Sequence, residues 1–557
     1  MIRKHLGRLA LLTSLAFLCA CGGSDGGVQG GDNNPPPPPP PPPPVAAFSL
    51  ALSIDKAVIT QGGSVPVTVT VTREAGFTGA VTLAASALPN GVTTPAVVVA
   101  ADATSVVMPL AAAPEAPHSL PTVTEIKGTA GELAKTASLT VTVRGKPGAV
   151  DTSFAAGKLI DAFSDRDDYV EAMALQADGR LVVAGHTTVT GSGTDFAVVR
   201  YLRDGGLDTS FGTGGRLTTA IAAGTRTDDA RAVALDAQGK ILVAGTSDGG
   251  ATGQDFALVR YNADGSLDAG FGDDGKVVTS FGNDADRALA ILVQLDGKIV
   301  LGGESYQGTA TGQDFALVRY NNDGSLDTSF GNGGKVLTAI SGFGGKDSVH
   351  ALARQVVNGQ ERIVAVGGES GFVMARYHAD GTLDAGFGNG GTIANLLGST
   401  VGAANAVVVD DADKLVIAGH SQQNFALVRL NVDGSFDTTF GTGGRVVHQV
   451  SVNDWDQATS VALQNDGKVV VGGWAFLPET GPRFSNFVLQ RYDANGALDD
   501  SFGHAGTVIT NASPRGRNNA GRAMLLQADT RVATVRAIQA GEAVDAANDF
   551  AVVRYWL

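Results

Sequence analysis

The sequence predicts an all-β protein. Hydrophobic residues make up 43% and charged residues 17% of the 557 positions, and 75 residues are glycine. This composition is typical of short strands joined by tight turns rather than of long charged helices. The formal net charge is −15, and a surface of that sign repels phosphate backbones, so we expect no nucleic-acid partner.

Residues 1–20 form a predicted lipoprotein signal peptide. Three basic residues precede an apolar run over residues 9–18, which is typical of an export signal and too short to span a membrane comfortably. The tetrapeptide LCAC at residues 18–21 resembles the bacterial lipobox, which implies cleavage before Cys21 and its lipidation. An ordinary cleaved signal peptide is the alternative, although it leaves an exported cysteine unpaired. Because Gly22 follows the cysteine, the resemblance favours the outer membrane, with the protein facing the periplasm or the cell surface.

Residues 21–44 predict a disordered tether. The stretch GGSDGGVQGGDNN has little to bury, and ten prolines occupy residues 35–44. In polyproline II conformation they form a spacer of roughly 31 Å. A proline-rich ligand for a partner domain is the alternative function of this segment.

Residues 45–146 predict a two-sheet β-sandwich. Val65, Val67, Val69 and Val71 alternate with polar residues, and turn residues separate this run from its neighbours. About a hundred residues of this kind are typical of a sandwich. The pattern resembles the immunoglobulin-like modules of exported bacterial proteins, and the resemblance implies a spacer or contact module.

Residues 147–557 consist of a repeated unit. Its D-x-x-F landmark recurs at spacings of 57, 60, 59, 57, 53 and 62 residues, a period that indicates stacked supersecondary units. One unit contains four strand-sized pieces, AVAL, KILVAG, DFALVRY and KVVTS, between residues 232 and 280. Four-stranded units repeated radially predict the blades of a seven-bladed β-propeller. The landmark phenylalanines are Phe154, Phe211, Phe271, Phe330, Phe387, Phe440 and Phe502.

The order of the pieces predicts how the ring closes. The repeat region opens with a landmark and an outer-strand piece in residues 151–163, and it ends after DFAVVRY at residues 549–555 without one. The N-terminal strand is therefore expected to complete the last blade, which would remove the exposed sheet edge of an open array.

Three phrases recur in fixed order, DGKIVLGG, DFALVRYNNDGSLDTSFG and GNGGKV. They closely resemble the delta-60 repeat family of bacterial propeller-like proteins, over about 400 residues. Membership implies an exported propeller and names no reaction. The pattern departs at the insertion in residues 354–364 and in residues 530–537, where the usual glycine is lacking.

One arginine and one aspartate recur in every unit, and we interpret them as structural ion pairs, because a buried arginine without a partner would be costly. A ring of arginines that binds an anion is the functional alternative. Similarly, Asp168, Asp228, Asp286, Asp347 and Asp456 are expected to cap the start of the innermost strands, with a bound cation as the alternative. The arginines are Arg200, Arg260, Arg319, Arg376, Arg429, Arg491 and Arg554, and the aspartates are Asp151, Asp208, Asp268, Asp327, Asp384, Asp437 and Asp499. The length of the turn decides whether Arg260 and Asp268 face each other directly.

The residue after the V-A-G phrase varies between units and predicts a ligand-binding rim on one face. Histidine, glutamate and tryptophan would suit a polar ligand such as a glycan, with the tryptophan as a stacking platform. A metal held by the two histidines is an alternative, but four blades separate them, so we expect no metal and no cofactor. The rim residues are His186, Thr246, Glu304, Glu369, His420 and Trp474, with Ala537 in the last unit.

These observations favour a lipid-anchored, exported, monomeric scaffold that binds protein or polysaccharide through variable loops on a rigid frame. The first alternative is a glycan lyase or hydrolase that uses His186, Glu304, Glu369 or His420 for acid and base chemistry, although the sequence assigns no catalytic residue. The second alternative is a structural component of the cell envelope.

Overall fold

The computed structural model describes residues 47–557, apart from short gaps at 75, 165, 222, 225, 251–252, 283–284, 309–311, 342–344, 370, 400, 452–454, 478–483, 514–516, 530–533 and 545–546. The signal peptide, Cys21 and the tether lie outside the described residues. Within the described ranges the structure is built from strands, and its one helical element is the 3-10 turn η1 (Ala155–Gly157). No helix among them has the length and apolar character needed to cross a membrane.

Two β-sheets pack face to face in residues 47–144 and form a sandwich. Their inward-facing side chains share one core, in which Phe48, Val69, Leu83, Ile126 and Val141 are almost fully buried. The alternation of valines over residues 65–71 therefore places every second side chain in this core. One sheet has the order β1 (Ala47–Leu52), β3 (Ser64–Glu74), β7 (Ser105–Ala112) and β5 (Val92–Thr93); the other has the order β2 (Lys56–Thr60), β9 (Leu133–Arg144), β8 (Thr122–Ala130), β4 (Val81–Ser86) and β6 (Val97–Val99).

The repeat region consists of antiparallel four-stranded units in which the strands follow one another in sequence. The first two complete units are β11 (Asp168–Leu175), β12 (Leu181–Val189), β13 (Gly193–Tyr201) and β14 (Arg216–Thr219), followed by β15 (Arg226–Leu235), β16 (Ile241–Gly250), β17 (Gly253–Tyr261) and β18 (Lys276–Thr279). A short parallel pairing of β13 with β15 joins these two units into one larger sheet.

The next two units follow the same plan. They are β19 (Asp286–Val293), β20 (Ile299–Tyr306), β21 (Gly312–Tyr320) and β22 (Lys335–Thr338), with the short β23 (Gly345–Lys346) beside β21, and then β24 (Val349–Val357), β25 (Gln360–Gly367), β26 (Val373–His378) and β27 (Thr392–Ile393). The insertion in residues 354–364 lengthens the hairpin between β24 and β25 and leaves the pairing of the two strands intact beyond its bulge.

The remaining units complete the region. They are β28 (Gly402–Val409), β29 (Leu415–Ser421), β30 (Asn424–Leu430) and β31 (Arg445–His448); β32 (Asp456–Leu463), β33 (Val469–Leu477), β34 (Phe484–Tyr492) and β35 (Thr507–Thr510); and β36 (Asn519–Asp529), β37 (Thr534–Val544) and β38 (Asn548–Trp556) with β10 (Lys158–Asp161).

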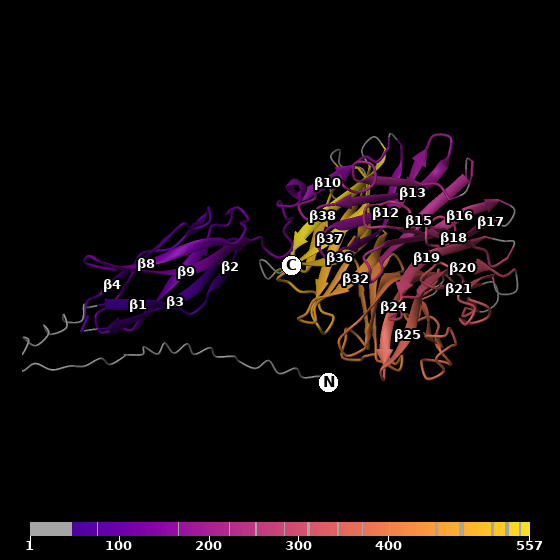
Figure 1. The fold of residues 1–557 in the computed structure, drawn as a ribbon. Coiled ribbons are helices and arrows are strands. Elements are labelled where there is room, and N and C mark those ends of the chain that lie inside the picture. Colours follow the sequence, from indigo (N-terminus) through magenta and orange to yellow (C-terminus); the bar gives the residue numbers. More distant parts are fainter. Residues whose placement is uncertain are drawn as a thin grey trace, which may run out of the picture.

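The first strands of these units contact one another in sequence order, from β11 through β15, β19, β24, β28 and β32 to β36, and β36 contacts β11. They therefore surround a common axis, and the later strands of each unit lie farther out. Figure 1 shows the result as a rounded lobe beside the sandwich. The arrangement is a β-propeller, in which both faces of each sheet are covered by neighbouring sheets.

The ring is closed by the strand that the order of the pieces predicted. Strand β10 pairs antiparallel with β38, with Lys158 opposite Val553 and Ile160 opposite Ala551. Residues from opposite ends of the repeat region therefore share one sheet. Ile160 packs in the same apolar cluster as Val553.

The segment that leads out of the sandwich also belongs to the ring. Gly148 donates its N–H to the carbonyl of Trp556 at 2.7 Å, and Asp151 donates to that of Arg554 at 2.7 Å. Its Val150 pairs with Tyr555, as Leu267 pairs with Tyr261 inside a complete unit. The linker thus replaces the turn that the last unit lacks, and the C-terminus lies beside the junction of the two lobes (Figure 1).

Candidate functional site

The recurring arginines and aspartates lie side by side in every unit. The Nε atom of each arginine is 2.6 to 2.9 Å from a carboxylate oxygen of its aspartate, and both side chains are mostly buried. The two positions face each other because the turn after Tyr261 brings the Asp268 N–H to within 3.0 Å of the Arg260 carbonyl. Because each guanidinium is engaged by a carboxylate, the geometry favours a structural role over an anion-binding ring.

Each of these aspartates receives a second cation, which the sequence analysis missed. The basic residue comes from the start of the second strand or the turn before it, as in the DGK phrase, and its recurrence was the available signal. Two cations on one carboxylate offset the cost of its burial more fully than one. The second cations are Arg180, Lys240, Lys298, Arg362, Lys414, Lys468 and Arg536, at 2.6 to 3.2 Å from Asp208, Asp268, Asp327, Asp384, Asp437, Asp499 and Asp151.

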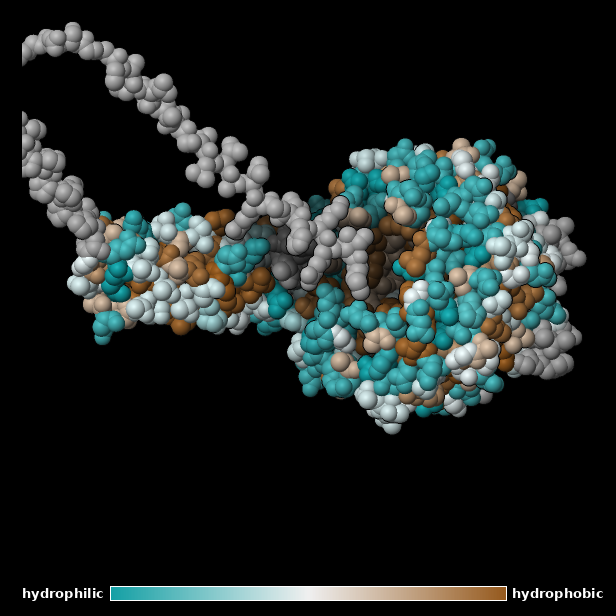
Figure 2. Space-filling view, turned by 60° about the horizontal axis from the view of Figure 1, so that its bottom comes forward, coloured by the Kyte–Doolittle hydropathy of each residue, from teal (hydrophilic) through white to brown (hydrophobic). Residues whose placement is uncertain are grey.

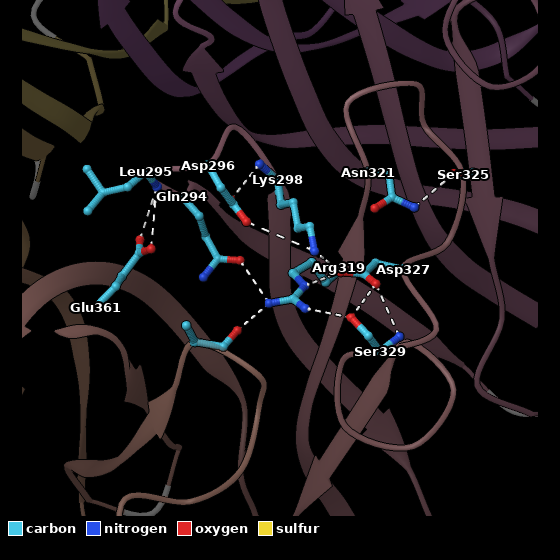
Figure 3. A network of polar contacts seen from close by, with 11 residues as sticks. Gln294, Leu295, Asp296, Lys298, Arg319, Asn321, Ser325, Asp327, Ser329 and Glu361 are labelled. Carbon is cyan, nitrogen blue, oxygen red and sulfur yellow. Dashed lines mark hydrogen bonds and ion pairs between the residues drawn. The ribbon is translucent and has the colours of Figure 1, made fainter.

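Figure 3 shows one of these networks in full. Asp327 accepts from Arg319 at 2.7 Å and from Lys298 at 2.8 Å, and its other oxygen accepts from the Ser329 hydroxyl at 2.6 Å. Burial raises the pKa of Asp327, but the hydrogen bonds from Lys298 and Ser329 and the charge of Arg319 hold it well below its ordinary value. The carboxylate is therefore ionised at neutral pH.

The same arginine joins neighbouring units. Arg260 donates to the carbonyl of Asn322 in the next unit at 2.6 Å, and Arg319 donates to that of Ala379. The guanidinium of Arg260 also lies 4.2 Å from the centre of the Phe271 ring, a cation–π contact that is repeated at the landmark phenylalanine of every unit. The repeated phrase DxxF is thus part of the packing between units.

The aspartates expected at the start of the innermost strands cap the preceding loop. Asp228 accepts from the Ile221 N–H at 2.7 Å and from the Ser247 hydroxyl at 2.6 Å, and Asp347 accepts from two backbone N–H groups in the same way. Asp168, Asp286 and Asp456 accept equivalent bonds. Among the described residues, no cluster of three histidine, cysteine, aspartate or glutamate side chains is placed to hold a metal ion.

Every innermost strand carries a β-bulge, and the unpaired residue differs from unit to unit. In β11, for example, the pairing skips from Val170 to Ala172 and leaves Glu171 out of register. A bulge of this kind re-aims its side chain. The bulge residues are Glu171, Arg231, Leu289, His350, Asn405, Thr459 and Arg522.

Polar contacts link successive bulges around the axis. Asn405 donates to the carbonyl of Ala458 at 2.8 Å, and Thr459 donates to that of Gly521 at 2.9 Å. The bulge residues Arg231 and Glu171 form an ion pair. Six of the seven bulge residues are polar, with Leu289 as the exception, and we call the seven together the bulge ring. Figure 2 shows one face of the propeller hollowed near its centre, with hydrophobic residues in the wall of the hollow.

Five of the proposed rim residues occupy one equivalent position directly behind the bulge ring. Each pairs with an innermost-strand residue two positions before a bulge, as His186 does with Tyr169, Glu304 with Arg287 and Trp474 with Gln457. Thr246 and His420 pair in the same register. His186, Thr246 and Glu304 are mostly buried, and His420 and Trp474 are partly exposed, so the position is a second layer rather than an open rim.

Two assignments to this position are wrong. Gly367 pairs with Val349, so Gly368 occupies the position and Glu369 lies one residue beyond it, exposed beside Lys346. The letters GGES occur in both the third and the fourth unit, but in the fourth unit the strand pairing is displaced by one residue. In the last unit the position belongs to Glu542, which follows Ala540-Gly541 as the others follow their V-A-G phrase, and not to Ala537.

Glu542 has the most perturbed carboxyl at this level of the ring. Burial raises its pKa to about 7, and the neighbouring charge of Glu171 adds to the effect, whereas Arg522 at 3.1 Å opposes it. On the other side of Glu171, Arg231 also approaches Asp229 at 3.5 Å. Charges of alternating sign therefore line this part of the axis.

One cavity of about 360 Å³ opens between three consecutive units at this level. Thr246, Glu304 and Glu369 line it, together with the bulge residues Arg231 and His350. His186, His420 and Trp474 do not line it. The four acid–base candidates of the sequence analysis are thus not gathered in one place: two glutamates share a cavity, and the two histidines lie elsewhere.

The fold and the repeated contacts define the chain as a β-propeller repeat protein. A family model described as "Domain of unknown function (DUF5122) beta-propeller" matches residues 176–211, 238–271, 294–330, 362–387, 413–440 and 464–502. All six segments end at the landmark phenylalanine; five begin in the turn before the second strand, and the fourth begins at Arg362 inside β25. The phrases that carry the ion pairs are thus the same ones that carry the family signal.

Comparisons with solved structures give low similarity. The tail fiber of Staphylococcus aureus phage P68 is 11% identical, with a TM-score of 0.25, over 48% of this chain and 49% of that chain. The chain thus spans about half the length of that protein. A DUF4784 family protein from Bacteroides caccae ATCC 43185 is 10% identical over 83% and 98%, with a TM-score of 0.22, and the surface layer protein SbsC, domains 4–9, is 11% identical over 84% and 82%, with a TM-score of 0.15. No curated protein matches.

Proposed function

We propose that the protein is a lipid-anchored, exported recognition scaffold that binds protein or polysaccharide at the bulge ring of a seven-bladed, delta-60-type propeller. The observation that carries the proposal is that some positions of the unit are constant and others vary. The Arg–Asp pairs and landmark phenylalanines recur in every unit, whereas the bulge ring and the layer behind it change from unit to unit. Invariant contacts build a rigid frame, and variable polar side chains on such a frame are typical of a binding surface.

Unpartnered polar atoms behind the bulge ring also support a recognition role. The Nδ1 atoms of His186 and His420 and the Nε1 atom of Trp474 are buried without a hydrogen-bond partner among the described residues. Buried polar groups are normally satisfied, so each exception requires an explanation, and a functional role is one of them. In each case the residue is one that varies between units.

The binding proposal is tested by incubating the protein with arrays of glycans and of envelope proteins. We expect retention on at least one array and weaker retention of the Trp474→Ala variant. Val278→Ala is the matched control, because Val278 is exposed on the outer strand β18, away from the axis. If neither array retains the protein, the structural-component alternative replaces the binding function.

The anchoring proposal rests on the lipobox-like residues 18–21. Lipidation at Cys21, the tether and an immunoglobulin-like sandwich would hold the propeller away from the outer membrane. Metabolic labelling with an alkyne fatty acid tests it: Cys21→Ala abolishes labelling, whereas Cys19→Ala retains it. Labelling that survives in the Cys21→Ala variant would contradict the anchor.

A glycan-active enzyme is the second candidate, because Glu304, Glu369 and His350 line one cavity. A pair of carboxylates is what most glycoside hydrolases use, and an imidazole can act as a general acid or base. The candidate predicts new reducing ends or unsaturated sugars when polysaccharides are incubated with the protein, and a loss of both in Glu304→Gln. Binding without turnover would exclude it.

A further inference from the structure

A cavity opens between the second, third and fourth units, whose innermost strands are β15, β19 and β24. It has the size of a small-ligand site. Its volume of about 360 Å³ falls at the lower end of the range for such sites. It lies at the level of the bulge ring and draws side chains from innermost strands as well as from the layer behind them. We call it the Arg287 cavity; the residues that matter for its chemistry are Asp229, Arg231, Arg287, Leu289, Glu304 and His350.

The wall of the cavity carries two pairs of side chains, each with a hydrogen-bond donor beside an acceptor. The Arg287 guanidinium lies 3.4 Å from Glu304, and the Arg231 guanidinium lies 3.5 Å from Asp229. Half of the Arg287 side chain is exposed, and only 6% of Glu304 is. A guanidinium beside a carboxylate offers donors and acceptors a few ångströms apart.

This pairing matches adjacent hydroxyl groups. A hydroxyl both donates and accepts, so each of two neighbouring hydroxyls can donate to the carboxylate while accepting from the guanidinium. A lone phosphate or carboxylate would use only the donors, and an ammonium would use only the acceptors. Leu289 supplies an apolar surface for the C–H face of a sugar ring.

The positions of the polar groups are held in advance. Gln254 accepts from Arg287 Nε at 2.6 Å, and Gln313 donates to Glu304 at 3.1 Å. On the same wall, the hydroxyl of Ser348 is buried without a hydrogen-bond partner among the described residues. A buried hydroxyl left unpaired costs free energy, and a ligand hydroxyl in the cavity would relieve that cost.

The charge of the cavity disfavours acidic ligands. Three carboxylates, Asp229, Glu304 and Glu369, face two guanidiniums, and burial lowers the pKa of His350, so its imidazole is neutral at pH 7. The whole chain carries −15. An anionic sugar would therefore approach a negative protein and enter a cavity without excess positive charge.

We propose that the Arg287 cavity binds a neutral oligosaccharide, with Glu304 and Asp229 accepting bonds from its hydroxyls and Arg287 and Arg231 donating to them. The inference rests on the proposed recognition function and names its ligand class. It requires no bond to be made or broken.

Saturation-transfer NMR and calorimetry on the intact chain test the proposal, in a detergent without a sugar headgroup. The neutral probes are maltose, cellobiose and N,N′-diacetylchitobiose, and the anionic probe is digalacturonate. We expect at least one neutral probe to bind, and to bind at least tenfold more weakly to Arg287→Ala and to Glu304→Gln. Glu304→Gln keeps the size of the side chain, so its effect does not depend on a loss of folding.

The matched control is Arg226→Ala, whose arginine is 42% exposed and does not line the cavity; it should bind as the unaltered protein does. Equal binding by both cavity variants, or tighter binding of digalacturonate than of every neutral probe, would overturn the proposal. If no disaccharide binds while the arrays retain the protein, the cavity assignment fails and the recognition function stands. If the arrays also fail, both fail.

Discussion

At the scale of single residues, Asp268 shows why burial rather than distance decides the value of an ion pair. Arg260 and Lys240 each lie 2.6 Å from the same carboxylate oxygen, but their side chains are 9% and 31% exposed. Removing a buried partner leaves an uncompensated charge, whereas an exposed pair contributes little because water screens it. The arginine also carries the contacts to Phe271 and Asn322.

We therefore predict that Arg260→Ala lowers the free energy of unfolding by about 3 kcal/mol and that Lys240→Ala lowers it by less than about 1 kcal/mol. Chemical denaturation of the two variants under the same conditions measures the difference. Equal losses would mean that the guanidinium has no special part in the packing between units.

Glu542 provides the clearest pH dependence. Its folded pKa of about 7 lies above the unfolded value of 4.5, so the native chain holds a proton that the unfolded chain releases between these values. Its contribution to stability therefore falls as pH rises from 4.5 to 7 and stays low above that. Glu542→Gln removes this slope: the variant should melt higher than the unaltered protein at pH 8, and the two should converge near pH 4.5. Parallel curves of melting temperature against pH would count against the assignment.

At the scale of elements, the turn after the landmark phenylalanine ties one unit to the next. Gly272 donates its N–H to the Asp323 carbonyl of the following unit at 2.8 Å. Its φ is +56°, and a Cβ atom there would lie 2.3 Å from the Lys276 carbonyl oxygen. Glycine is needed at this point for both reasons.

Gly272→Ala should lower the free energy of unfolding by about 2 kcal/mol or more, since it adds left-handed strain to a backbone clash. Gly282→Ala is the control, because a Cβ atom at Gly282 would meet no atom within 4 Å. A thermal shift of the first variant no larger than that of the second would show that the turn adjusts freely.

The sequence was most informative where a position recurs. Comparing seven copies of a phrase separates the shared positions from residues that occur by chance in one copy. The four strands of a unit, the recurring arginines and aspartates and the missing outer strand could therefore be predicted. The bulge ring could not, because its residues share no chemistry: Glu171, Leu289 and Thr459 fill equivalent places. Only the strand register identifies them.

Register also explains the misplaced residues. In the third unit the second glycine of G-G-E, Gly303, pairs with the residue before the bulge, whereas in the fourth unit the first glycine, Gly367, does so. Glu369 therefore lies one residue beyond the layer that Glu304 occupies. In the last unit the eroded phrase concealed Glu542, although the short motif A-G-E was present. A shift of one residue in the strand pairing is hard to see in the hydropathy pattern of the sequence. In the structure it moves a functional side chain out of its layer.

At the scale of the whole molecule, the sandwich is joined to the ring at its closure. His118 of the sandwich lies edge-on to Trp556, with ring centres 4.9 Å apart, and its Nδ1 atom is 3.8 Å from Asp151. Gly145 passes so close to Trp556 that a Cβ atom would lie 2.3 Å from the indole. The linker supplies Pro147, whose carbonyl accepts the N–H of Gly503 from the neighbouring unit at 3.0 Å.

Ring closure is the central claim, because only a closed ring brings the bulge residues around one axis. It depends on the pairing of β10 with β38, segments almost four hundred residues apart in the sequence. The chain has no cysteine after Cys21, so an introduced pair of cysteines reports on this contact without competition from another thiol in the sandwich or the propeller.

The most direct test is a cross-link between β10 and β38. Lys158 lies opposite Val553, and Val552 points to the other face of its strand. Under mild oxidation, the Lys158→Cys/Val553→Cys variant should form a disulfide within one chain, detected by mass spectrometry and by faster migration on a non-reducing gel, whereas Lys158→Cys/Val552→Cys should not. Failure of the first pair to cross-link, or cross-linking only between chains, would contradict the closed ring.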